Sequence, residues 1–202
     1  MTFLATKKRM GKFTLIMMIG IPGSGKSTWA KNILLTPQYT KGRVFHYIST
    51  DDIRIDLFGT VEFNPKQKMQ VYEEAFSRID KLKQAAQKDP RDIETVVILD
   101  STNTDKRLWE MYLWDLQPNT MIAKVFMIPP EIAIKRIEET RTDVNRRIPL
   151  DILQMKWKEL IENLKDLPSY FDFVYFTNIK NHGAALFEET STTTNDLELL
   201  NH

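Results

Sequence analysis

The chain has 202 residues, 42% apolar and 27% charged, which is typical of one globular domain with a single core. Its net charge of +1 gives no general attraction to nucleic acid, although a local groove can still be basic. The absence of cysteine excludes disulfide bonds and thiolate metal sites, and it fits a reducing cytoplasm. No apolar run in the sequence is long enough to span a bilayer, and the basic start is not followed by the apolar segment of a signal peptide. We therefore expect a cytoplasmic protein.

Short apolar runs alternate with longer helical patterns, which predicts a parallel sheet covered by helices. The expected strands are 14–19, 44–48, 95–99, 121–128 and 171–176. The expected helices are 26–35, a long one between Asn64-Pro65 and Asp89-Pro90, 105–116, 131–140, and one that starts at Pro149.

Two of these helices carry apolar stripes that should face the sheet. The polar segment 142–147 is expected to be a mobile connection within a lid of about 136–150. The kinase domain would end near residue 180, followed by a polar tail over 181–202. The stripes are formed by Met69, Tyr72, Phe76, Ile79, Leu82 and Ala86 in the long helix, and by Ile152, Met155, Leu160 and Leu164 in the last one.

A phosphate-binding loop of the pattern G-x-x-x-x-G-K-[ST] follows the first strand. Its glycines allow torsions that turn successive N–H groups inward, and the next helix begins with its positive dipole end there. Lys26 is expected to reach the β- and γ-phosphates of ATP, and Ser27 to supply a hydroxyl to Mg²⁺. The alternative is a glycine-rich turn that matches by chance. The predicted nucleotide-binding residues of this loop are Gly20, Pro22, Gly23, Ser24, Gly25, Lys26, Ser27 and Thr28.

The loop alone does not choose among GTPases, ATPases and kinases. A guanine-reading N-K-x-D motif is absent, because the stretch 178–181 lacks the aspartate. The short chain and its late charged segment favour a kinase that closes a lid to exclude water.

Two acids directly after the second strand are candidates for the acceptor side of the site. The carboxyl ends of the strands face the ligand crevice in such a sheet, and Asp51 would be the base that takes the acceptor proton. Arg54 lies three residues later, on the same side of a starting helix, and suits an acceptor that carries a phosphate. The alternative makes Asp51 the N-cap of that helix and Asp52 a partner of its dipole.

Asp100 ends an apolar strand and is the predicted second ligand of Mg²⁺, beside Ser27. Alternatively it only caps the next turn. Thr102 and Asn103 would either cap the following helix or line the acceptor pocket, and capping is slightly favoured.

Arginines surround the proposed lid. Their guanidinium groups bind phosphate oxygens in a bidentate manner and could neutralise charge on the transferred group. We expect Arg141 and Arg147 to contact the nucleotide, and favour Arg136 and Arg146 less. The alternative is a solvated charged face, since acids are interleaved with them.

Four segments resemble, in order and spacing, the kinase domain of phage polynucleotide 5′-hydroxyl kinase. They are IGIPGSGKSTWA (19–30), ISTDDIR (48–54), ILDSTNTDKR (98–107) and residues 124–158, within a match over about 14–165. The resemblance implies an α/β P-loop kinase three-layer sandwich with a five-stranded parallel sheet and a helical lid. It also implies that Asp51 is the general base, that Arg54 binds the substrate phosphate, and that Arg141 is the lid arginine at the nucleotide.

The expected activity is ATP-dependent phosphorylation of the 5′-hydroxyl of a DNA or RNA end, in a host cytoplasm if a phage encodes the protein. Ser101 stands where the family has its acceptor-side acid, which leaves the substrate preference open. No D-x-D-x-T motif of a 3′-phosphatase follows the kinase segments. The alternatives are a kinase of a nucleoside, sugar or antibiotic, and an ATP-binding regulatory module without acceptor chemistry.

Overall fold

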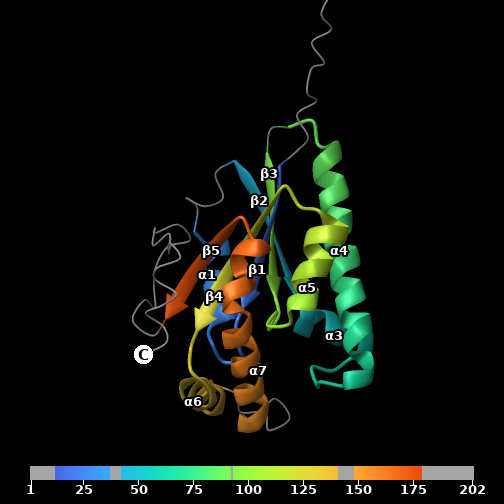
Figure 1. Ribbon diagram of the computed structural model, residues 1–202. Coiled ribbons are helices and arrows are strands. Elements are labelled where there is room, and N and C mark those ends of the chain that lie inside the picture. Colours follow the sequence, from blue (N-terminus) through green and yellow to red (C-terminus); the bar gives the residue numbers. More distant parts are fainter. Residues whose placement is uncertain (1–11, 37–41, 92, 141–147, 179–202) are drawn as a thin grey trace, which may run out of the picture.

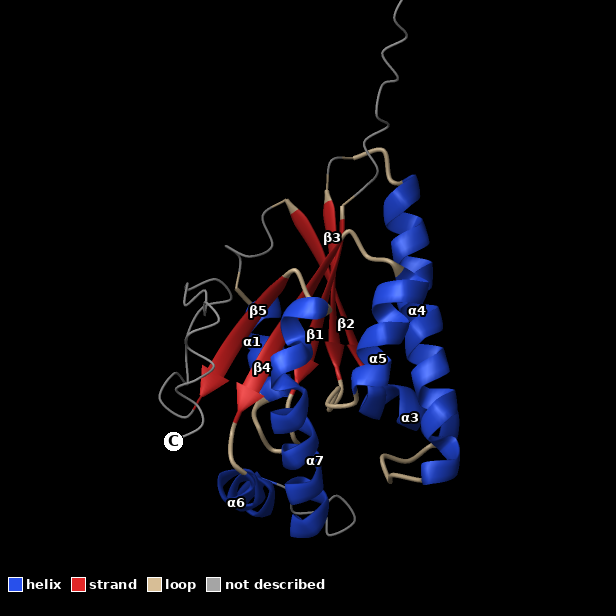
Figure 2. Cartoon of the chain, in the orientation of Figure 1, coloured by secondary structure: helices blue, strands red, loops and turns tan. Residues whose placement is uncertain are grey.

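The computed structural model describes residues 12–36, 42–91, 93–140 and 148–178. Its centre is a five-stranded parallel sheet in the order β2-β3-β1-β4-β5, with helices on both faces, as the sequence predicts (Figures 1 and 2). Each predicted strand is present, with ends shifted by one or two residues. The strands are β1 (Phe13–Ile19), β2 (Arg43–Ser49), β3 (Glu94–Asp100), β4 (Thr120–Met127) and β5 (Phe173–Asn178).

The helices also follow the predicted order, although two of them differ in detail. The helix predicted over 105–116 is a short α-helix continued by a π-helix. The long helix is preceded by a 3₁₀ turn that begins at the predicted Pro65. The helices are α1 (Lys26–Leu34), α3 (Thr50–Phe58), η1 (Pro65–Gln67), α4 (Lys68–Lys88), α5 (Lys106–Met111), η2 (Tyr112–Leu116), α6 (Pro130–Thr140), α7 (Leu150–Asn163) and η4 (Leu164–Ser169).

The two faces of the sheet form separate apolar clusters. One face packs against α4, α5 and α7, and the other packs against α1 (Figure 1). Trp29 is partly buried against the second cluster. The indole of Trp29 makes an edge-on contact with Phe126, at 6.0 Å between ring centroids. β1, β3 and β4 are almost wholly buried, because parallel strands covered on both faces expose no side.

The predicted apolar stripes are partly wrong in phase. In α4 the fully buried side chains include Val71 and Ala75, whereas Met69 is exposed. In α7 Leu153 and Leu160 are buried, whereas Ile152 and Met155 are exposed. Both helices contain more apolar residues than the core can cover, so periodicity alone did not select the buried ones.

A third, smaller cluster lies beyond the carboxyl ends of the strands. It joins Ile21 of the loop after β1 to Ala133 and Ile137 of α6 and to Leu153 of α7. The first part of the proposed lid, in α6, is therefore packed against the loop. The connection 142–147 and the tail 181–202 lie outside the described residues.

Candidate active site

The loop from Gly20 to Ser27 connects β1 to α1 and has the backbone that the motif requires. Gly23 and Gly25 have φ of 79° and 95°, in the left-handed region that favours glycine. At Gly20 a Cβ atom would lie 3.0 Å from both the Phe126 Cβ and the Ser24 Oγ, so a side chain would fit there only if these neighbours shifted. The Gly20 N–H donates to the Thr102 carbonyl at 3.0 Å, which ties this loop to the one after β3.

Lys26 is placed inside the loop. Only 8% of the residue is exposed, and its ammonium donates to the carbonyl oxygens of Gly20 and Ile21 at 2.8 and 2.9 Å. α1 begins after Gly25 without a side-chain cap and without an acid in its first turn. Its first N–H groups therefore form an electropositive end suited to phosphate, with Ser27 and Thr28 exposed beside them.

The two predicted metal-side residues, Ser27 and Asp100, are brought together by a residue that sequence reasoning missed. The Tyr47 hydroxyl, on β2, donates to the Asp100 carboxylate at 2.5 Å. Burial raises the pKa of the Tyr47 phenol, the hydrogen bond to Asp100 and the Asp100 charge raise it further, and hydrogen bonds with Ser27 and Ser49 oppose the shift. No sequence motif identifies Tyr47 as a site residue, because it meets Asp100 only through the pairing of β2 with β3.

The residues present fit a magnesium nucleotide, although they do not form a metal cage alone. Among the described residues, no group of three or more histidine or acidic side chains could hold a metal ion. Mg²⁺ typically takes one or two protein carboxylates and completes its shell with substrate phosphates and water. Ser27 and Asp100 are the side chains that would hold it, and the ion would neutralise charge on the transferred phosphoryl group.

Asp51 and Arg54 form an ion pair at the start of α3, with 2.7 Å between the Asp51 Oδ1 and the Arg54 Nη1. The Asp51 side chain is 56% exposed, whereas that of Arg54 is 12% exposed. The N-cap of α3 is Ser49, whose hydroxyl accepts from the Asp52 N–H at 3.2 Å. The alternative interpretation, in which Asp51 caps the helix, is therefore wrong, and the Asp51 carboxylate remains accessible at the strand ends.

Sheet register places this pair near the loop. Ser49 at the end of β2 pairs with Asp100 at the end of β3, and the Thr50 hydroxyl donates to the Asp100 carbonyl at 3.4 Å. Asp51 follows Thr50 directly. Ser27, Asp100 and Asp51 are thus linked through Tyr47 and Thr50 at the carboxyl ends of three neighbouring strands.

The segment after β3 corrects the expectation that Thr102 or Asn103 caps the next helix. The cap of α5 is Asp105, whose carboxylate accepts from the Arg107 N–H. Asn103 is buried with a φ of 49°, and its amide donates to the Met18 carbonyl at 2.8 Å. Its role is to hold β1 and β3 together beneath the loop.

α6 lies close enough to the loop to bring an arginine to it. A Cβ at Gly23 would lie 2.6 Å from the Ala133 carbonyl, and one at Gly25 would have the Arg136 guanidinium as its nearest neighbour at 4.0 Å. Sequence reasoning ranked Arg136 below Arg141 and Arg147. Those two arginines, with Arg146, lie outside the described residues.

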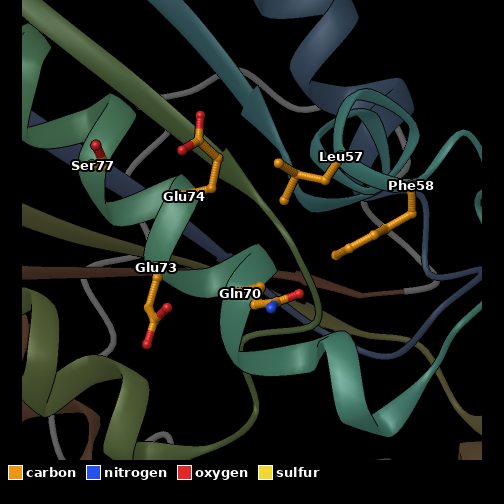
Figure 3. Close-up of a pocket in the computed structure, with 6 residues that line it drawn as sticks. All are labelled: Leu57, Phe58, Gln70, Glu73, Glu74 and Ser77. Atoms are coloured by element: carbon orange, nitrogen blue, oxygen red, sulfur yellow. The ribbon is translucent and has the colours of Figure 1, made fainter.

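A separate cavity of about 500 Å³ opens between α3 and α4 (Figure 3). Leu57 and Phe58 project into it from the end of α3, and Gln70, Glu73 and Glu74 line it from α4. It contains no residue of the phosphate loop and neither Asp51 nor Arg54.

None of the helices in the described part of the chain has both the length and the apolar character of a membrane-spanning helix.

Comparison with known proteins agrees with this arrangement. Residues 15–164 match the family AAA_33, described as an AAA domain. Among solved structures, a chain of the Pnkp1/Rnl/Hen1 RNA repair complex is similar at 20% identity with a TM-score of 0.62, over 80% of this chain and 48% of that one. A gluconokinase from Sinorhizobium meliloti 1021 is similar at 13% identity with a TM-score of 0.51, over 82% of each chain.

A second structure of the Pnkp1/Rnl/Hen1 complex is similar at 22% identity with a TM-score of 0.50, over 71% of this chain and 45% of that one. This chain therefore spans about half the length of the RNA repair chains it resembles. At these identities the structural likeness shows the fold, which is that of a P-loop kinase. The matched residues cover most of the sequence, and the chain belongs to the AAA_33 family of P-loop kinase domains.

Proposed function

We propose that this chain is an ATP-dependent kinase that transfers the γ-phosphate to the 5′-hydroxyl of a polynucleotide end. The observation that carries the proposal is the Asp51–Arg54 ion pair, which lies at the strand ends beside the phosphate loop. A protein that only binds or hydrolyses ATP needs no acceptor base with a cation at its side.

The proposed roles follow from position and charge. Asp51 takes the proton of the 5′-hydroxyl as that oxygen forms its bond to the γ-phosphorus and the bond to ADP breaks. Arg54 binds the acceptor phosphate nearest to the hydroxyl and fixes its orientation. The loop N–H groups and Lys26 hold the β- and γ-phosphates, and Arg136, Arg141 and Arg147 contribute positive charge from the lid side.

A small-molecule kinase is the second candidate, and the comparison with gluconokinase favours it. That likeness covers 82% of both chains, and Arg54 could bind the carboxylate of a sugar acid as well as a phosphate. A regulatory module would bind ATP and transfer nothing beyond slow hydrolysis.

An acceptor panel tests the proposal. Labelled ATP would be mixed with the protein and, separately, with a 5′-hydroxyl RNA oligonucleotide, the matching DNA oligonucleotide, a nucleoside and gluconate. We expect transfer to the oligonucleotides, with an efficiency that falls as salt is raised, because phosphate contacts are salt-sensitive. Transfer to gluconate or a nucleoside alone would support the second candidate, and no transfer to any acceptor would support the regulatory module.

A further inference from the structure

Tyr72 of α4 lies beside the proposed acceptor site, and cations from three helices lie near it. Lys68, one turn earlier on α4, places its ammonium 5.7 Å from the centre of the Tyr72 ring. Tyr72 is partly buried, and its hydroxyl makes a hydrogen bond with Ser101, the residue after Asp100. The ring therefore extends from Lys68 toward the end of β3.

Two further cations act on the same phenol. Burial and, to a lesser extent, the negative charge of Asp105 raise the pKa of Tyr72, whereas the Ser101 hydrogen bond and the charges of Lys156 and Arg54 lower it. Lys156 lies on α7 and Arg54 on α3. The three cations Arg54, Lys68 and Lys156, with Tyr72 between them, are here called the Tyr72 cluster.

The cations of the Tyr72 cluster differ in whether an acidic side chain forms an ion pair with them. Arg54 is paired with Asp51 at 2.7 Å, and Lys156 with Glu159 at 2.6 Å. Glu159 also accepts from the Thr104 hydroxyl at 2.5 Å, so its negative charge is shared between two donors. Lys68 lies against the Tyr72 ring and acts electrostatically on Asp105, whose carboxylate is itself paired with Arg107 at 2.7 Å. Within the described part of the chain, Lys68 forms no ion pair of its own.

The opposite side of α4 has the opposite charge. The cavity between α3 and α4 is lined by Glu73 and Glu74, which would repel a phosphate backbone. Arg78 forms an ion pair with Glu74 at 2.7 Å. The positive charge of Arg78 is therefore already balanced, and it does not make this side of α4 attractive to phosphate. A polynucleotide that enters at Arg54 is therefore favoured to continue toward Lys68 and Lys156 and away from this cavity.

We propose that Lys68 and Lys156 bind the second backbone phosphate of the acceptor, one nucleotide beyond the phosphate held by Arg54. The Tyr72 ring would lie between the first and the second phosphate. This rests on the proposed function and makes it more specific, because a second backbone phosphate is present in a polynucleotide and absent from a mononucleotide or a sugar acid. A mononucleotide or a sugar acid would end at Arg54. The Tyr72 cluster would thus give the enzyme its preference for polymers.

The test compares an acceptor with one phosphate with an acceptor that has several. The wild type, Lys68→Ala, Lys156→Gln and the double variant would be assayed on a nucleoside 3′-monophosphate and on a 5′-hydroxyl hexanucleotide. We expect each single variant to lower kcat/KM for the hexanucleotide about fivefold, mainly through KM, with less than a twofold change for the mononucleotide. The slope of log(kcat/KM) against log[salt] for the hexanucleotide should become shallower by about 0.7 in the double variant.

Matched controls separate this role from a general effect of charge. Lys66→Ala removes an exposed cation two residues before Lys68, and Lys158→Gln removes one from α7 that lies 3.8 Å from Glu162. Both should resemble the wild type on both acceptors. Lys68→Arg keeps the charge and should restore most of the loss. An equal loss on both acceptors, or an unchanged kcat/KM for the hexanucleotide, would overturn the proposal.

A direct binding measurement separates a failure of this inference from a failure of the proposed function. If the wild type phosphorylates neither acceptor, the proposed function is wrong, and the second-phosphate site is judged by fluorescence anisotropy of a labelled 5′-hydroxyl hexanucleotide. Weaker binding with a shallower salt slope in the double variant would support the site. Equal affinity and slope in the wild type and double variant would refute it.

Discussion

Replacing Gly23 by alanine tests the contact between the phosphate loop and α6. Gly23 has a φ of 79°, and an added Cβ would lie 2.6 Å from the Ala133 carbonyl oxygen and 2.9 Å from the Ile137 Cγ1. The substitution therefore carries two costs: a side chain in the left-handed region, and a collision with the backbone of α6.

A second glycine isolates the first of these costs. Gly59, at the end of α3, has a φ of 70° and no heavy atom within 4 Å of an added Cβ. We expect Gly59→Ala to lower the free energy of unfolding by about 1 kcal/mol, from the backbone conformation alone. Gly23→Ala should lower it by about 2–4 kcal/mol, because a close-packed contact with a backbone oxygen relaxes only at the cost of strain.

The assay is urea unfolding of both variants and the wild type, together with ATP binding. The difference between the two alanine variants measures the collision, and Gly23→Ala should also weaken ATP binding, since α6 and Arg136 would be displaced from the loop. Equal destabilisation by Gly23→Ala and Gly59→Ala would refute the packing of α6 on the loop.

Three further predictions concern side chains around the site and the core. Burial lowers the pKa of the Lys124 ammonium in the folded protein to about 8, from 10.5. The unfolded chain therefore binds the Lys124 proton more tightly than the folded protein does. The free energy of unfolding of the wild type should accordingly increase as the pH rises from about 8 to 10.5. Lys124→Met should lack this rise and be about 2–3 kcal/mol more stable than the wild type in urea unfolding at pH 7, and parallel pH profiles for the two proteins would contradict this. Tyr47→Phe removes the hydrogen bond that orients Asp100, so the Mg²⁺ concentration for half-maximal activity should rise severalfold; an unchanged Mg²⁺ titration would count against Asp100 as a ligand. Arg136→Ala should raise KM for ATP severalfold with little change in KM for the acceptor, and an unaltered KM for ATP would remove Arg136 from the nucleotide site.

Local patterns predicted the parts of the site whose residues are close in sequence. The loop motif predicted Gly20, Gly25 and Lys26, because the required backbone and charge lie within eight residues. The Asp51–Arg54 contact followed from helical spacing of three residues.

Contacts between distant segments were not predictable in the same way. Tyr47 meets Asp100 and Ser27 only because β2 pairs with β3, and Arg136 reaches Gly25 only because α6 packs on the loop. Ser49 competes with Asp51 as the cap of α3, and the strand geometry before the helix decides between them. In α4, Val71 is buried and Met69 is exposed because of where the sheet lies relative to the helix. The spacing of apolar residues in the sequence does not contain that information.

Asp51→Asn tests whether Asp51 is the acceptor base, because it keeps the shape of the side chain and removes its basicity. Transfer from ATP to a 5′-hydroxyl oligonucleotide would be measured in a single turnover, with Asp52→Asn as the control, since Asp52 is a neighbouring exposed acid in the same first turn. We predict a loss of about 10²–10⁴-fold in the Asp51 variant, the usual contribution of a general base, with near wild-type transfer in the control. Undiminished transfer by Asp51→Asn would show that Asp51 is not the general base.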